Sequence, residues 1–321
     1  MKDLQPDRRQ FLRTSAATAA AAAIPAGFVR SAAAAEKAVS AGRIRLGAPV
    51  FNAPKDPEGL ALAHKQMGYR AAYCPKIPVE DTDRIRDTAA AFAKHDIVIA
   101  EVGRWCNLMD ADPEKRAANL ANVTDGLALA EAIGARCCVD IAGSFNEEVW
   151  SGPHPKNLTD EFFDLAVENA REIIDAVKPR RAKFCYEMMG WAIPHTVDSY
   201  LALMKAVDRD AFAVHLDPAN LINSPEKYFD TTSLINEAFD KLGPHIVSCH
   251  AKDVGWVPEM QVHFVEVPLG QGTLDYRTYL KRLAALQDPP PLMVEHMKGA
   301  EQYDACRKYV FALGEEIGVG F

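Results

Sequence analysis

The stretch AFAVHLD at residues 211–217 is a mainly apolar run that ends in a carboxylate, and AKFCYE at residues 182–187 has the same form. Runs of this length and composition are typical of strands that are buried on both faces of a parallel sheet. An amphipathic segment at about residues 196–207 lies between them and has the pattern of a helix. The order of strand, helix and strand predicts a βαβ unit at this point of the chain.

The same alternation extends outward in both directions. Eight segments have strand-like composition: Ile44–Phe51, Tyr69–Pro75, Ile97–Arg104, Ala135–Gly143, Ala182–Met189, Ala211–Asp217, Ile246–Asp253 and Pro291–Met297. Helical patterns follow them at about Pro57–Met67, Glu80–His95, Pro113–Gly134, Thr159–Val177, Thr196–Val207, Thr231–Leu242, Asp275–Leu286 and Ala300–Ile317. Eight successive units predict an α/β fold, a single closed (β/α)₈ barrel. An open dinucleotide-binding sheet has no support, because Gly47-Ala48-Pro49 lacks the G-x-G-x-x-G spacing.

The first 35 residues differ from the rest of the chain. The pair Arg8-Arg9 precedes a weakly apolar, Ala-rich stretch at residues 16–24, and the run Ala32–Ala35 offers an Ala-x-Ala cleavage site. This order predicts a twin-arginine export signal at residues 1–35, a barrel domain at residues 36–321 and a periplasmic location. The apolar stretch is much shorter than the roughly 20 residues of a spanning helix, so we expect no stable membrane insertion.

Composition limits the function further. The chain has a formal net charge of −8, and residues 1–35 contain five basic and two acidic residues, so the charge without them is −11. Nucleic-acid binding proteins normally present a basic face, and we therefore expect no nucleic-acid partner. Seven cysteines occur without a C-x-x-C pair and lie mostly in strand-like runs, which favours buried free thiols over a disulfide framework.

Four polar residues stand at the carboxyl ends of four successive predicted strands, where active sites of such barrels lie. They are Glu187, Asp217, His250 and Glu295, and their spacings of 30, 33 and 45 residues each correspond to about one strand and helix unit. Three close carboxylates inside an apolar barrel need a compensating charge. Ion pairs with Arg181, Lys183 or Lys252 are one solution, and a single divalent metal ion held by all four residues is the simpler one. This donor set favours Mn²⁺ and also suits Mg²⁺, Co²⁺ or Zn²⁺.

A family resemblance rests on these residues in their local sequences. The pattern Glu187, Asp217-Pro218-Ala219-Asn220, His250-Ala251-Lys252-Asp253 and Glu295, with the turn Gly270-Gln271-Gly272, resembles the xylose isomerase-like TIM barrel family of sugar phosphate isomerases and epimerases. The family includes ketose 3-epimerases and inosose dehydratases. The resemblance implies one metal ion on the four residues, proton exchange with substrate by Glu187 and Glu295, and a homodimer.

Two positions differ from the ketose 3-epimerases. Asn220 stands where those enzymes typically carry a histidine, and Gly255 and Trp256 lie where an arginine would follow His250. Both positions hold sugar hydroxyls in the epimerases. The sequence therefore makes a simple ketose substrate doubtful.

The predicted function is a metal-dependent sugar isomerase or epimerase that removes a proton next to a carbonyl and passes through an enediolate, with Glu187 and Glu295 as acid and base. Two alternatives stay open. The first is a lyase or dehydratase on a keto-sugar, keto-glycoside or inosose, and the second is a non-catalytic sugar-binding protein. Because sugar phosphates are cytoplasmic, an exported member is expected to act on a non-phosphorylated sugar or cyclitol.

Five further residues are candidate substrate contacts, each with a structural alternative: Asn220, Lys252, His154, Trp191 and Glu101. Lys252 could instead pair with a ligand carboxylate, His154 could be a surface residue, Trp191 could pack a loop, and Glu101 could pair with Arg104. His215 is expected to point into the barrel as a core histidine. His64, His95 and His245 are expected on helix surfaces.

Overall fold

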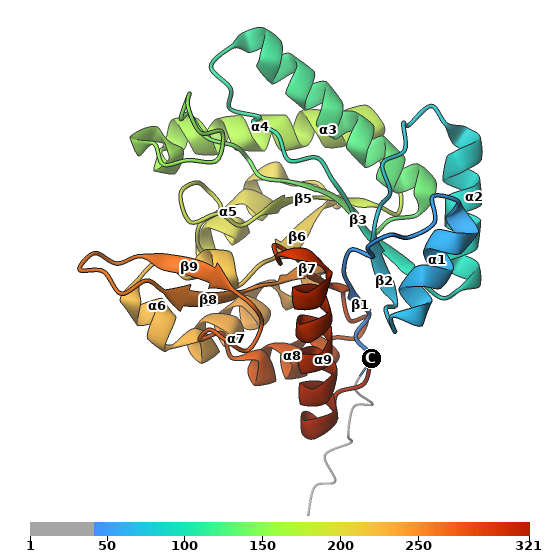
Figure 1. Ribbon diagram of the computed structural model, residues 1–321. Coiled ribbons are helices and arrows are strands. Elements are labelled where there is room, and N and C mark those ends of the chain that lie inside the picture. Colours follow the sequence, from blue (N-terminus) through green and yellow to red (C-terminus); the bar gives the residue numbers. More distant parts are fainter. Residues whose placement is uncertain (1–41) are drawn as a thin grey trace, which may run out of the picture. The chain divides into compact units, whose positions relative to one another are not determined.

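The computed structural model describes residues 42–321, and within this part eight parallel strands close into a barrel (Figure 1). The strands lie in the order β1-β10-β7-β6-β5-β4-β3-β2, and β1 closes the barrel by pairing with both β10 and β2. Their bounds are β1 (Leu46–Gly47), β2 (Ala71–Tyr73), β3 (Val98–Gly103), β4 (Cys137–Asp140), β5 (Lys183–Glu187), β6 (Phe212–Leu216), β7 (Ile246–Ala251) and β10 (Leu292–Val294). The predicted single (β/α)₈ barrel is confirmed.

Helices connect the strands along the chain: α1 (Pro57–Gln66), α2 (Thr82–Lys94), α3 (Pro113–Ile133), α4 (Asp160–Val177), α5 (Val197–Val207), α6 (Pro225–Phe229), α7 (Thr231–Leu242), α8 (Tyr276–Ala284) and α9 (Gly299–Ile317). Aspartates cap the first turns of α1 and α3, where the Asp56 and Asp112 side chains accept hydrogen bonds from backbone N–H groups. Gly134 ends α3 with φ of 81°, a conformation that favours glycine. None of the described helices is long and apolar enough to cross a membrane.

One predicted strand is divided in the structure. Ile246–Asp253 was expected to be continuous, but β7 ends at Ala251 and an antiparallel hairpin of β8 (Asp253–Trp256) and β9 (Phe264–Val267) follows (orange in Figure 1). The buried Asp253 carboxylate causes the change of direction, because it accepts hydrogen bonds from four backbone N–H groups: those of Val254, Gly270, Gly272 and Leu274. This carboxylate therefore fixes both the hairpin and the Gly270–Gly272 turn.

The barrel interior is filled by small and medium side chains. Buried groups inside it include Cys137, Val139, Cys185 and Ala213 on one side, and Ala71, Ala100 and Met293 on the other. All seven cysteines lie in the described part of the chain and are free, and five of them are buried, which confirms the expectation of free thiols. This packed floor leaves the carboxyl ends of the strands as the place for polar groups.

Two histidines expected on helix surfaces are buried instead. His64 of α1 is 5% exposed and packs between Tyr69 and Phe92, with ring centroids 6.2 and 5.9 Å away. His95 follows α2, and its Nε2 lies 2.7 Å from Glu58 Oε1. The sequence pattern of one helix does not show what packs against it. In the structure, α2 contributes Phe92 beside His64, and α1 contributes Glu58 beside His95. His245 is exposed, as expected.

Candidate metal centre

The four predicted ligands meet at one end of the barrel. Glu187 is the last residue of β5, His250 lies in β7, and Asp217 and Glu295 directly follow β6 and β10. All four side chains are buried, and one potential ligand atom from each lies within 4.8 Å of the others. The parallel strands produce this convergence, because their carboxyl ends share one rim.

His250 is oriented so that one ring nitrogen faces the carboxylates. Its Nδ1 lies 2.7 Å from Glu187 Oε1, 3.0 Å from Glu295 Oε1 and 3.9 Å from Asp217 Oδ2. The opposite nitrogen, Nε2, lies 3.1 Å from Glu101 Oε1. Nδ1 is therefore the nitrogen that is available to a cation held by the three carboxylates.

Lys252 is the basic residue of this cluster. Its Nζ lies 2.8 Å from Asp217 Oδ2 and 2.7 Å from Glu295 Oε1, and the side chain is 2% exposed. The other two candidate ion-pair partners point elsewhere, since Lys183 Nζ donates to the Asp210 carbonyl and Arg181 contacts Glu131. Of the three ion pairs considered as an alternative to a metal ion, the structure contains only the pairing of Lys252 with Asp217 and Glu295.

The residues fit a divalent cation. Asp217 Oδ2 and Glu295 Oε1 are buried and make no hydrogen bond, and their nearest cationic group is the Lys252 ammonium at 2.8 and 2.7 Å. Three carboxylates and one lysine leave two negative charges uncompensated when His250 is neutral. Buried oxygens of this kind are costly unless they are paired or coordinate a metal. A single divalent ion would supply the missing positive charge.

The two glutamates differ in proton affinity. Burial raises the pKa of Glu187 to about 7. Burial also opposes ionisation of Glu295, but the attraction of His250 and Lys252 outweighs it and holds the pKa of Glu295 well below its usual range. Two carboxyl groups whose environments separate their pKa values in this way are typical of an acid and base pair.

A cavity of about 450 Å³ opens above the cluster. Its walls include Glu187, Glu295, Lys252 and Asn220, together with four aromatic side chains and two further polar residues: Tyr73, Trp105, Trp150, Tyr303, Glu266 and His296. This volume lies within the range of about 300–1,000 Å³ that is typical of small-molecule sites. The cluster is therefore accessible to a ligand of sugar size.

The five predicted substrate contacts separate into two groups. Asn220 and Lys252 line the cavity. Glu101 lies below the cluster, in contact with His250 rather than with Arg104. His154 caps the short helix η1 (Pro155–Leu158), and Trp191 is 60% exposed; neither lines the cavity. The loops after β4 and β5 carry these two side chains away from the Glu187, Asp217, His250 and Glu295 cluster.

Several residues of the cavity were not singled out from the sequence. Glu266 comes from the unexpected hairpin, and its Oε2 lies 2.9 Å from His296 Nδ1. Trp105 lies two residues after the end of β3 and His296 directly follows Glu295, and both have positive φ angles, of 43° and 59°. Such backbone strain often occurs at functional sites. The sequence could have indicated Trp105 and His296 as cavity residues, because both lie near the carboxyl ends of predicted strands.

The chain belongs to the Xylose isomerase-like TIM barrel family, because residues 62–309 match the sequence pattern of that family. Residues 5–25 match the signal sequence of the twin-arginine translocation pathway, so the chain carries a signal for export by that route. No curated protein sequence is significantly similar to the whole chain.

Solved structures with the same fold include several sugar epimerases. A 3-keto-D-glucoside 4-epimerase from E. coli is 14% identical, with a TM-score of 0.63 over 85% of this chain and 100% of that one. D-psicose 3-epimerase from Clostridium cellulolyticum H10 is 16% identical, with a TM-score of 0.61 over 86% and 100%. A Xylose isomerase-like TIM barrel protein from Mycobacterium smegmatis, solved with magnesium, is 20% identical, with a TM-score of 0.60 over 86% and 97%. At these identities the similarity shows the fold.

Proposed function

We propose that this protein is a divalent-metal-dependent epimerase or isomerase that acts on a neutral keto-sugar. The observation that carries the proposal is the position of Glu187 and Glu295. Both belong to the cluster around His250 and both line the cavity, and they come from strands that are separated in the barrel by β6 and β7. Two carboxyl groups on different sides of one site can remove a proton from one face of a carbon and return it to the other.

A divalent cation held by the four ligands would polarise a carbonyl of the substrate and stabilise the negative charge that develops on its oxygen. The protein's own groups have separate tasks. Glu187 and Glu295 move the proton, and Lys252 offers a buried positive charge beside Asp217 Oδ2 and Glu295 Oε1. Asn220 is held by a hydrogen bond of 2.9 Å from its Nδ2 to the Met188 carbonyl, and its position in the wall suits a contact with a substrate hydroxyl.

The cavity favours an uncharged substrate. Among its lining residues Lys252 and His296 are the only basic side chains, and both contact carboxylates. A phosphate group would normally require an arginine or lysine cradle that is free to bind it. Four aromatic side chains instead offer flat apolar surfaces, which suit the faces of a sugar ring. Free keto-sugars, keto-glycosides and cyclitol ketones fit this description, and the twin-arginine signal agrees with a substrate outside the cytoplasm.

Metal dependence of turnover tests the proposal. The protein is stripped with a chelator, assayed on a panel of neutral keto-sugars and keto-glycosides, and assayed again with Mn²⁺ or Mg²⁺. We expect activity only with metal, and a loss of about 10²–10⁴-fold in Glu187→Gln and Glu295→Gln. The exposed Glu147 is the matched control, and Glu147→Gln should retain full activity. Binding of a sugar without turnover in the metal-loaded protein would favour the sugar-binding alternative.

A further inference from the structure

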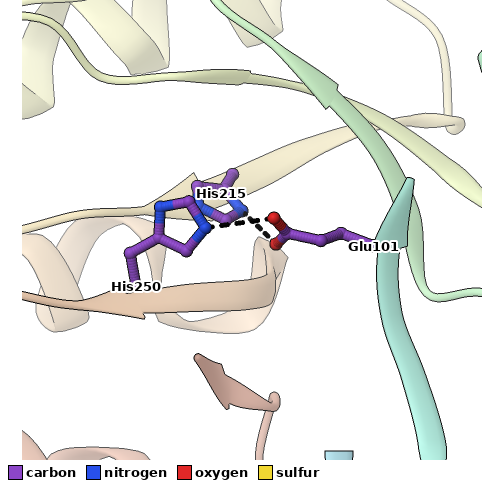
Figure 2. A group of neighbouring side chains, drawn as sticks. All are labelled: Glu101, His215 and His250. Carbon is purple, nitrogen blue, oxygen red and sulfur yellow. Dashed lines mark hydrogen bonds and ion pairs between the residues drawn. The ribbon is translucent and has the colours of Figure 1, made fainter. Parts of the chain in front are cut away.

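Three buried polar side chains from different strands, Glu101, His215 and His250, meet on the Nε2 side of the His250 ring (Figure 2). Glu101 extends from β3 toward His215 of β6 and His250 of β7, and its carboxylate faces both imidazole rings from the same side. The three side chains are at most 1% exposed. None of them lines the 450 Å³ cavity above, so a substrate in that cavity would not touch them.

The contacts of His250 assign its two nitrogens different tasks. Nδ1 faces Glu187 and Glu295, and Nε2 faces Glu101 Oε1 at 3.1 Å. A neutral imidazole carries one hydrogen and one free lone pair. If Nδ1 gives its lone pair to a cation, the hydrogen must be on Nε2. An ionised Glu101 is then the acceptor that this N–H requires.

Glu101 is itself held in place. Ser248 Oγ donates a hydrogen bond of 2.9 Å to Glu101 Oε2, and His215 Nδ1 lies 3.5 Å from the same oxygen. The His215 and His250 rings meet edge to face, with centroids 4.1 Å apart. Each of the two carboxylate oxygens of Glu101 is therefore occupied by neighbours, and its preferred direction is toward His250 Nε2.

We propose that Glu101 is a positioning residue that fixes the tautomer and ring orientation of His250, and thereby sets the affinity of the centre for its metal ion. The inference rests on the proposed metal-dependent function and adds a residue outside the four ligands. A second metal ion on Glu101, His215 and His250 is disfavoured, because Nε2 would have to release its hydrogen while Nδ1 already serves the first ion. An isolated buried carboxylate would be costly, whereas one that orients a metal ligand offsets that cost through tighter metal binding.

The test measures metal affinity rather than activity. Mn²⁺ is titrated into metal-free protein, and the free ion is followed by electron paramagnetic resonance. We expect Glu101→Ala to weaken binding by about 10–100-fold, as is typical when the hydrogen-bond partner of a ligating histidine is removed. Glu101→Gln retains an oxygen acceptor and should fall between wild type and Glu101→Ala. Ser248→Ala removes one support of Glu101 and should have a smaller effect, and Glu147→Gln should have none.

A spectroscopic readout separates positioning from general stability. In the Mg²⁺-loaded protein, ¹⁵N spectra of the histidine side chains should show His250 with its hydrogen on Nε2, and this signal should shift or broaden in Glu101→Ala. Thermal unfolding of the metal-free variants identifies any that fail to fold, and Ser248→Ala then serves as the milder variant.

Three results would overturn the inference. The first is Mn²⁺ affinity in folded Glu101→Ala within about twofold of wild type, against the expected 10–100-fold loss. The second is a stoichiometry of two Mn²⁺ ions per wild-type chain, with one of the two ions lost in Glu101→Ala. The third is a wild-type protein that binds no Mn²⁺, a result that would contradict the proposed function as well. If Glu101→Ala binds Mn²⁺ more weakly but the wild-type protein turns over none of the sugars, the positioning role of Glu101 is supported and only the proposed reaction is contradicted.

Discussion

Lys252 Nζ lies 2.8 Å from Asp217 Oδ2, and both side chains are buried at the carboxyl rim of the barrel. The same amine lies 2.7 Å from Glu295 Oε1. A lysine among metal ligands partly neutralises them and also repels an incoming cation. Lys252 therefore has opposite effects on the stability of the metal-free protein and on its affinity for metal.

Lys252→Met should separate these two effects. Without the amine, Asp217 loses its ion-pair partner at 2.8 Å and Glu295 Oε1 keeps only His250, so the free energy of unfolding of the metal-free protein should fall by about 3–5 kcal/mol. Mn²⁺ should bind at least about tenfold more tightly, because one repulsive charge has gone. Urea unfolding and isothermal titration calorimetry measure the two quantities. The exposed Lys205 provides the control variant Lys205→Met, and equal values for the two variants would show that Lys252 has no part in the centre.

The barrel and the centre of its site were predictable because both depend on periodicity. Alternating strands and helices define the fold, and Glu187, Asp217, His250 and Glu295 each stand at or beside the carboxyl end of one strand, so the topology brings them together. The bounds of the strands were less predictable. The predicted ranges ran into the loops, and β1 has only two residues, since chain composition does not show where hydrogen bonding to a neighbour stops.

The cavity walls could not be predicted in the same way. Trp150 and Glu266 reach the cavity from a loop and from the β8–β9 hairpin, whose paths depend on tertiary contacts such as those of Asp253. Trp191 follows Glu187 by only four residues in the sequence, but the loop after β5 carries it outward. Loop conformation rather than sequence distance decides which aromatic side chains face a substrate.

Trp150 and Trp191 provide a direct comparison of wall and surface. Trp150 lines the cavity and Trp191 does not, although both are exposed aromatic residues. Trp150→Ala should raise KM by about three- to tenfold, as expected for the loss of one aromatic contact worth about 0.5–1.5 kcal/mol, and should leave kcat within about twofold. Steady-state kinetics on the best substrate of the panel measures this. The reverse pattern, with the increase in Trp191→Ala, would place the substrate in a different part of the rim.

His64 should make the fold sensitive to acid. Burial lowers its pKa to about 4, and its Nδ1 has no hydrogen-bond partner. In the unfolded chain the pKa is about 6.5, so as the pH falls from 6.5 toward 4 the unfolded state binds a proton that the folded state does not, and stability is lost. The stability of wild type relative to His64→Leu should therefore fall by about 2 kcal/mol between pH 8 and pH 5.

Urea unfolding at a series of pH values measures this difference. His245 is exposed, and His245→Gln should follow the wild-type curve over the whole range. If the difference between wild type and His64→Leu stays constant with pH, the ring takes up its proton equally in the folded and unfolded states, which would contradict the buried neutral form.

Hydrogen exchange reports whether Glu187 and Glu295 move a proton next to a substrate carbonyl. The protein is incubated with excess Mg²⁺ in D₂O with neutral ketoses, inososes and 3-keto-glucosides, beside Glu295→Gln, and the sugars are followed by proton NMR. We predict that deuterium enters at the carbon next to the carbonyl with the skeleton intact, in wild type but not in the variant. Loss of a substituent would establish a lyase instead, and absence of exchange with every substrate would contradict the proton-transfer account.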